Sequence, residues 1–263
     1  MKRLEILKPD TIIGAVNVIG VPLSLIFAIS MIVWPWIAGH GNWEYVQSVW
    51  DRWQSLNVGL LAFISSVIAF NIARYNNDRQ RAREFLAAKA SLPATLSSLT
   101  DYFSESSKFL LNAWKTTTQS SSSPSLAIPS LPHGCQSVFA ECIRHAEPEV
   151  GEYLAKILAR LQIHDSRMRS CAKALTSPNV VTPIRHNLVT YFFRLGELQA
   201  MVDKLFNFAR NIGEFDRSPP QWPEFENSYS VLGLCPSDIV VDTNTSLESF
   251  TKRRISSGLE FNA

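Results

Sequence analysis

The sequence predicts an all-α protein in which a two-helix transmembrane hairpin precedes a cytoplasmic helical bundle and an irregular C-terminal tail. Three observations predict this architecture. Two long segments near the N-terminus lack charged residues, the middle of the chain repeats apolar residues at helical spacing, and the end of the chain is acidic and proline-rich. Charged residues make up only 18% of the 263 residues, whereas about a quarter is typical of a soluble domain.

After an N-terminal flank (residues 1–10), the predicted hairpin occupies residues 11–73. No Asp, Glu, Lys or Arg occurs between Asp10 and Glu44, and 20 of the 27 residues in 12–38 are apolar. A second segment, 53–73, has 14 apolar residues among 21. Twenty-one helical residues extend about 32 Å, which matches the roughly 30 Å hydrocarbon core. Two alternatives stay open, namely buried core helices of a soluble protein and a cleaved signal peptide for the first segment.

The distribution of Lys and Arg predicts the orientation. The N-terminal flank has three such residues, the external loop (39–52) has one, and the stretch after the second span has five. The positive-inside rule then places both termini in the cytoplasm. The basic residues that carry this prediction are Arg74, Arg79, Arg81 and Arg83, followed by Lys89. Attraction to anionic lipid headgroups is a second interpretation of the same four arginines.

Tryptophan is concentrated at the opposite ends of the two predicted spans. Five of the seven tryptophans occur there: Trp34, Trp36, Trp43, Trp50 and Trp53. Amphipathic indole rings favour the headgroup level of a bilayer, so the cluster predicts an aromatic belt at the outer interface.

Small residues recur at helical spacing in both spans. The first span contains Gly20, Ser24 and Ala28, and the second contains Ser55, Gly59, Ala62, Ser66, Ala69 and Ala73. Small side chains let helices approach closely in lipid. Two interpretations follow, either packing of one span on the other or self-association of several copies.

Two other features of the spans carry structural predictions. Asn17 and Asn71 would lie at the same level of an antiparallel hairpin, where they can hydrogen-bond to each other. Pro22 lies inside the first span and should bend it.

Residues 74–215 predict one helical bundle. Apolar residues recur at steps of three, four or seven from Phe85 to Trp114, and Pro93 marks a helix boundary near Ser91. A short helix is expected over 136–146 and a longer one from Pro148. The most regular pattern runs from Ile184 to Ile212 at alternating steps of four and three, with Thr182 as the helix start and Gly213 as the stop.

For two regions the sequence predicts little regular structure. Residues 116–132 are rich in Ser and Thr and predict a disordered loop. The tail, residues 216–263, has four basic and seven acidic residues and predicts a mostly irregular segment with a weak strand over 237–243.

One stretch resembles a known group of proteins. The residues RQRAREFLAAKASLPATLSSLTDY, from Arg79 to Tyr102, follow directly after a second span. This arrangement is similar to that of uncharacterised two-span bacterial inner-membrane proteins. The resemblance covers about the first 115 residues, implies a bacterial inner membrane, and carries over no activity and no site residues.

The sequence contains no recognisable catalytic or cofactor motif. The candidate metal ligands Cys135, Cys142, His145, His164 and Cys171 do not form the two close pairs typical of zinc sites. Phosphate-binding loops and G-x-S-x-G are absent. A net charge of +2 gives no indication of nucleic-acid binding. We therefore expect no enzyme activity, no cofactor and no metal.

These observations leave two functional hypotheses. The first is a membrane-tethered interaction or scaffolding module with a cytoplasmic protein partner. The alternative is a homo-oligomeric membrane effector, of a defence or toxin type, whose spans perturb or permeabilise the bilayer. The lipid bilayer is the expected partner in both.

Overall fold

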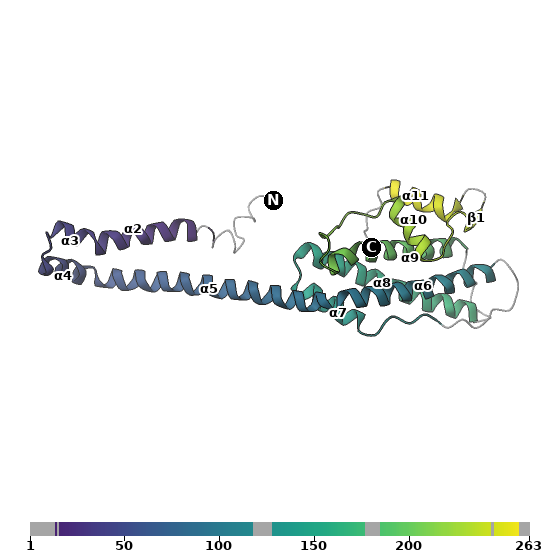
Figure 1. The fold of residues 1–263 in the computed structure, drawn as a ribbon, viewed down its shortest axis with the longest axis horizontal. Coiled ribbons are helices and arrows are strands. Elements are labelled where there is room, and N and C mark those ends of the chain that lie inside the picture. The colour runs from purple at the N-terminus through teal and green to yellow at the C-terminus, as the bar shows by residue number, and fades with distance from the viewer. Residues whose placement is uncertain (1–13, 15, 118–127, 177–184, 243–244, 258–263) are drawn as a thin grey trace. The chain divides into compact units, whose positions relative to one another are not determined.

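A computed structural model describes residues 14, 16–117, 128–176, 185–242 and 245–257 (Figure 1). Within these ranges the chain is mostly helical, as predicted. The chain divides into two compact units, residues 1–80 and 81–263. The boundary therefore lies seven residues after the predicted position at 73/74. A single continuous helix crosses it, so the helical pattern carries no mark of the division.

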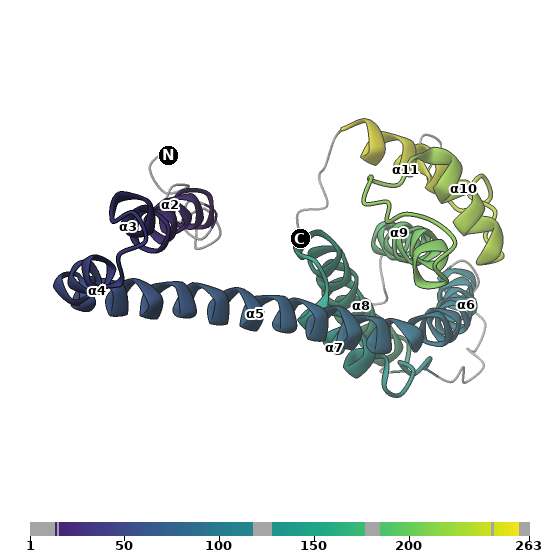
Figure 2. The same cartoon turned by 60° about the vertical axis from the view of Figure 1, so that its left-hand side comes forward.

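The first unit is a pair of antiparallel helical arms. One arm consists of a π-helical turn η2 (Val16–Gly20), α2 (Val21–Ile32) and α3 (Trp34–Ala38). A corner helix, α4 (Trp43–Arg52), connects it to α5 (Gln54–Ala90), whose first part forms the other arm (Figure 2). Two helical stretches, Asn17–Ala38 and the one that begins at Gln54, are long and apolar enough to cross a membrane.

The prolines of the first arm explain its irregularities. Pro22 lies in the first turn of α2, directly after the π-helical turn, so the change of helix type occurs next to this proline, and the bend stays a prediction. Pro35 has no N–H to donate to the carbonyl of Met31, four residues earlier. The indole Nε1 of Trp50 donates to that carbonyl instead, at 2.8 Å. The Trp50 side chain thus supplies the hydrogen bond that the Met31 carbonyl would otherwise receive from a backbone N–H at position 35.

Most of the predicted connection at 39–52 is a helix, α4, which the sequence analysis did not predict. Asn42 caps this helix by accepting a hydrogen bond from the backbone N–H of Glu44. At Gly39, any Cβ would lie 2.7 Å from a ring carbon of Tyr45, so the corner requires glycine there. A ten-residue helix in this position shows no long apolar period, which is why the sequence pattern did not reveal it.

The second unit contains the last turns of α5 and the bundle helices. These are α6 (Leu92–Thr116), α7 (Cys135–His145), α8 (Pro148–Thr176) and α9 (Arg185–Ala209). The predicted boundary near Ser91 is confirmed, with Pro93 in the first turn of α6. Residues 118–127 of the predicted Ser/Thr-rich loop lie outside the described residues, and so does the predicted start of the last long helix at Thr182.

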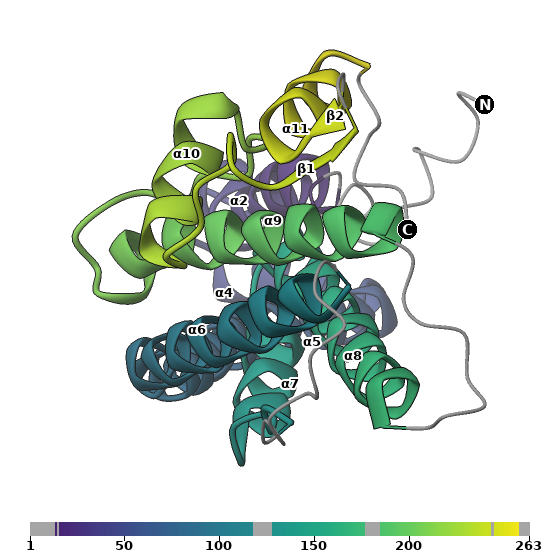
Figure 3. The same cartoon turned by 90° about the vertical axis from the view of Figure 1, so that its right-hand side faces the viewer.

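Helix α9 is the centre of the second unit. It lies between α6 and α8 on one side and α10 and α11 on the other (Figure 3). Fourteen of its residues are buried, and they include Glu197 and Gln199 among the apolar side chains. Buried polar side chains such as these two need hydrogen-bond or ionic partners.

The prediction of a mostly irregular tail is wrong. The tail forms α10 (Trp222–Val231), a small antiparallel pair β1 (Val240–Asp242) and β2 (Thr245–Ser246), and α11 (Leu247–Ser256). The hydroxyls of Tyr229 on α10 and Thr251 on α11 are 2.7 Å apart and buried. Both helices are ten residues long, a length that is marginal in isolation, so contacts with α9 stabilise them.

Helix α9 ends at Ala209, earlier than predicted, and the residue that terminates it is not the predicted Gly213. Asn211, not Gly213, adopts the left-handed conformation, with φ of 58°. The N–H of Ile212 bonds to the carbonyl of Asn207 and that of Asn211 to Phe208, which is the Schellman pattern. Asparagine tolerates this conformation better than other non-glycine residues, so it can replace glycine as the stop.

Candidate functional site

The small residues of the two arms do not face each other. Gly20, Ser24 and Ala28 line a groove whose opposite wall consists of bulky α5 residues, namely Phe63, Ile64, Val67 and Ile68. The first set of small residues thus faces the other arm across this groove.

The second set lies on a different face of α5. The residues of α5 that are partly covered within the first unit are Asn57, Leu60, Ile64, Val67 and Asn71. At 100° per residue, the small residues centre about 160° away from these. All six are exposed: Ser55, Gly59, Ala62, Ser66, Ala69 and Ala73. A Cβ added at Gly59 would meet no described atom within 4 Å. Packing between the two arms therefore does not account for this set, which we call the α5 stripe.

The five tryptophans gather at the corner of the first unit. The rings of Trp36 and Trp43 lie 5.8 Å apart, and those of Trp43 and Trp50 lie 6.0 Å apart. Trp34 is 65% exposed and Trp53 is 45% exposed. The corner thus presents exposed indole rings, which is the arrangement expected of an interfacial belt.

The predicted asparagine pair is confirmed. The amides of Asn17 and Asn71 exchange two hydrogen bonds, each 3.1 Å long. Asn71 also donates to the carbonyl of Val67. Such an interhelical amide pair contributes about 1 kcal/mol in an apolar environment and fixes the register of the two arms.

The predicted basic run is divided between the two units. Arg74 pairs with Asp78, and Arg79 lies over the ring of Tyr75. Arg83 is exposed. Arg81 instead donates to the carbonyls of His145 and Ala146, at the end of α7.

Lys89 also belongs to the fold of the second unit rather than to a free basic surface. It is buried, donates to Asn211 at 2.7 Å and lies over the ring of Phe208. Burial lowers its pKa. Sequence counting cannot distinguish these uses of a basic residue from a role in membrane orientation.

The cysteines and histidines lie apart. Among the described residues, no group of three or more His, Cys, Asp or Glu side chains is arranged to hold a metal ion. Cys135 is buried, and burial raises the pKa of both Cys142 and Cys171 to about 11. These thiols are therefore protonated at neutral pH and behave as small apolar side chains. His145 lies between Glu84 and Glu141, with a contact of 3.1 Å to each carboxylate.

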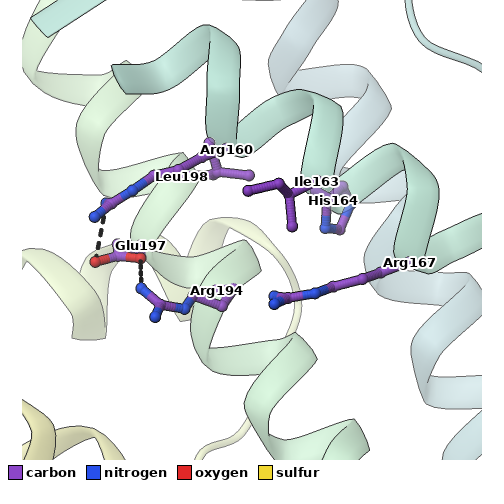
Figure 4. Close-up of a pocket in the computed structure, with 7 residues that line it drawn as sticks. All are labelled: Arg160, Ile163, His164, Arg167, Arg194, Glu197 and Leu198. Carbon is purple, nitrogen blue, oxygen red and sulfur yellow. Dashed lines mark hydrogen bonds and ion pairs between the residues drawn. The ribbon is translucent and has the colours of Figure 1, made fainter. Parts of the chain in front are cut away.

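A pocket of about 60 Å³ between α8 and α9 brings charged residues together (Figure 4). It is lined by Arg160, Ile163, His164 and Arg167 of α8 and by Arg194, Glu197 and Leu198 of α9. The spacing of these residues, three, four or seven along each helix, places each set on one helical face. We call this space the arginine pocket.

Glu197 holds two arginines at the inner end of the arginine pocket. Its Oε1 is 3.0 Å from Nη1 of Arg160, and its Oε2 is 2.8 Å from Nη1 of Arg194. The carboxylate side chain is only 7% exposed, and that of Arg160 is 12% exposed. A buried carboxylate of this kind needs such charge-assisted partners, because removing one partner leaves an uncompensated charge.

His164 and Arg167 complete the arginine pocket. His164 is buried, its ring contacts Tyr102 and Phe103 edge to face, and burial lowers its pKa to about 4. Its Nε2 is buried and has no hydrogen-bond partner among the described residues. Arg167 is half-buried and lies 5.6 Å from the centre of the Tyr191 ring. At neutral pH the pocket thus has three cationic groups, one carboxylate and an uncharged imidazole.

Sequence analysis identified only His164 among these residues, and did so as a metal-ligand candidate. A signal was present, since Arg160, His164 and Arg167 share one face of α8, and Glu197 interrupts the apolar pattern of α9. The convergence of the two faces depends on how α8 and α9 are rotated against each other. One sequence does not determine this rotation.

Comparisons with protein-family models, with curated proteins and with solved structures found no match.

Proposed function

We propose that this chain is an integral protein of a bacterial inner membrane. In this proposal, residues 12–38 and 53–73 cross the bilayer as a hairpin, and both termini are cytoplasmic. The observation that carries it is the exposure of large apolar side chains on both arms. Leu23 is 67% exposed, Ile26 63%, Leu61 64% and Ile68 54%. A soluble unit rarely exposes so continuous an apolar surface, whereas lipid covers it at no cost.

Three further features support the membrane hypothesis. The apolar arms contain no acidic or basic residue from Asn17 to Ala38 or from Gln54 to Ala73. The Asn17–Asn71 pair and the tryptophan corner lie at opposite ends of the arms. Basic residues follow at the asparagine end, beginning with Arg74. This order of features is typical of a hairpin with a cytoplasmic asparagine end.

In this proposal the second unit is an interaction or scaffolding module tethered to the membrane. Its support is a core of its own, built from α6 to α11, in which Cys135, Cys142 and Cys171 are buried. A module that binds a cytoplasmic protein partner needs a stable helical surface and membrane attachment, and the two units supply one each.

A specific observation favours a second function, that of a homo-oligomeric membrane effector. The α5 stripe is exposed and faces away from the first arm, and small-residue faces of this kind support close helix association in lipid. If several copies associate through this stripe, a ring of spans can enclose a path through the bilayer.

Native mass spectrometry of the full chain released from nanodiscs separates the two functions. A monomer or dimer without conductance supports the scaffolding function. A ring of four or more copies that conducts ions supports the effector. In the second case, Gly59→Leu with Ala62→Leu should disperse the ring. Ser65→Leu should not, because it adds a leucine side chain at an exposed α5 position outside the stripe.

A further inference from the structure

We propose that the arginine pocket between α8 and α9 binds a tetrahedral oxyanion, either free phosphate or the phosphate group of a small phosphomonoester. Arg167 and Arg194 would contact the anion at the mouth of the pocket, and His164 would form part of its inner wall. This inference concerns the second unit alone, so it stands or falls independently of the membrane assignment.

The charge of the pocket is the first argument. Three arginines and one carboxylate line it. Glu197 balances one of the three positive charges, so the pocket has a net charge of +2. Arg194 already bonds to Glu197 through Nη1 and keeps further N–H donors on a guanidinium with five. Arginine is the preferred side chain for phosphate because its planar donor fork matches two phosphate oxygens.

Arg167 is the arginine of the pocket that forms no ion pair with a described carboxylate. No carboxylate lies within 4 Å of its guanidinium in the described part of the chain, whereas Arg160 and Arg194 both contact Glu197. The ring of Tyr191, 5.6 Å away, positions it beside the pocket. A bridge between α8 and α9 needs only Arg160 and Glu197. Arg167 therefore adds positive charge that the fold does not require.

The size and burial of the pocket define the ligand class. Its volume of about 60 Å³ corresponds to about four water-sized positions, enough for one tetrahedral ion but not for a whole nucleotide. Glu197 and His164 are buried, whereas Ile163 is 43% exposed. The organic part of a phosphomonoester can thus extend past Ile163 into solvent while the phosphate group lies between the arginines.

The unsatisfied polar atom is a second, independent argument. His164 Nε2 is buried without a hydrogen bond, and leaving such an atom unsatisfied costs about 1–3 kcal/mol. His164 Nε2 is one of several such atoms among the described residues, and it is one that lines a pocket, where a bound water or ion can satisfy it. An apolar residue in this position would avoid the cost. A bound oxyanion would instead accept a hydrogen bond from Nε2 of His164.

The test uses the full chain in nanodiscs of phosphatidylcholine, titrated with inorganic phosphate and separately with glycerol 3-phosphate at constant ionic strength. Calorimetry should detect saturable binding of at least one of them. Arg167→Gln should weaken it by at least about tenfold, because one charge-assisted contact is lost. Arg217→Gln is the matched control, because Arg217 is exposed, lies outside the pocket and pairs with Glu149, which is also exposed, so no buried charge loses its partner.

A second variant keeps the test decisive if Arg167→Gln does not fold. Ile163→Trp fills the mouth without changing the charge, and it should weaken binding to a similar extent. Tighter binding of glycerol 3-phosphate than of phosphate would identify an ester as the ligand, and the reverse order would identify the free ion. The proposal is overturned if neither anion saturates, if Arg217→Gln weakens binding as much as Arg167→Gln, or if chloride competes on equal terms.

Discussion

At the scale of single residues, the buried ammonium group of Lys89 has a hydrogen-bond acceptor in Asn211. Asn211 is also the left-handed residue that ends α9. Replacing Asn211 by glycine keeps the backbone conformation but removes the acceptor. We expect Asn211→Gly to lower the free energy of unfolding by about 1–3 kcal/mol, the cost of an unsatisfied buried donor. Denaturant unfolding of the second unit, followed in detergent, measures this value.

Asn211→Asp is the control for this substitution. Aspartate tolerates the left-handed conformation and still offers an oxygen to Lys89. We therefore expect a stability close to that of the original chain. If Asn211→Gly proves as stable as Asn211→Asp, the hydrogen bond to Lys89 does not matter and the account of this helix end is wrong.

His164 predicts a dependence of stability on pH. Its pKa is about 4 in the folded chain because burial disfavours the charged form, and about 6.5 in an unfolded chain. Between these values the unfolded state binds the proton and the folded state does not. The stability contribution of neutral His164 is therefore complete above pH 6.5 and is lost as the pH falls toward 4.

The substitution His164→Gln should flatten this dependence. A difference of about 2.5 pH units corresponds to about 3 kcal/mol at most. Unfolding midpoints measured from pH 7 to pH 4 should fall less steeply in His164→Gln than in the original chain. Equal slopes in His164→Gln and the original chain would contradict the assignment.

At the scale of elements, α9 and α10 meet at a glycine. A Cβ at Gly196 would lie 2.5 Å from Cε1 of Tyr229, closer than atoms can approach. We expect Gly196→Ala to displace α10 and to destabilise the second unit by about 1–3 kcal/mol through overpacking. Tyr229→Leu should remove much of the clash, so the double variant should lose less stability than the two single effects combined. Thermal unfolding of the four proteins tests this, and simple additivity would argue against the contact.

The long helices were predictable because their own sequence patterns define them. Pro93 marked the boundary between α5 and α6, and the helix from Pro148 followed from its apolar period. Helices α10 and α11 were not predictable in this way, because they are short and are stabilised by contacts such as Phe225 stacked on Phe193. Local signals did exist, for example Pro223 in the first turn of α10 and Ser246 as the cap of α11.

The candidate sites show the same division between local and long-range information. Asn17 and Asn71 could be paired from the sequence because an antiparallel hairpin fixes their relative heights. The arginine pocket could not, since Arg160 and Glu197 converge only when the rotation of α8 against α9 is known. The direction of the α5 stripe likewise depends on which face of α5 meets the first arm.

At the scale of the whole molecule, two units with opposite surface chemistry occur in one chain. The first exposes apolar side chains along both arms, whereas the second buries a core of its own. In the proposed function, the first unit is solvated by lipid and the second by water. The central claim is therefore that the arms cross a membrane and that the second unit lies on its cytoplasmic side.

Thiol labelling in spheroplasts with a membrane-impermeant maleimide tests this claim most directly. Gln47→Cys introduces a thiol on exposed α4, and the native Cys235 is an exposed thiol of the second unit. We predict that Cys235 reacts only after the membrane is permeabilised, whereas the thiol at position 47 reacts in intact spheroplasts. Reaction of both thiols under the same condition, or recovery of the chain in the soluble fraction, would contradict the account.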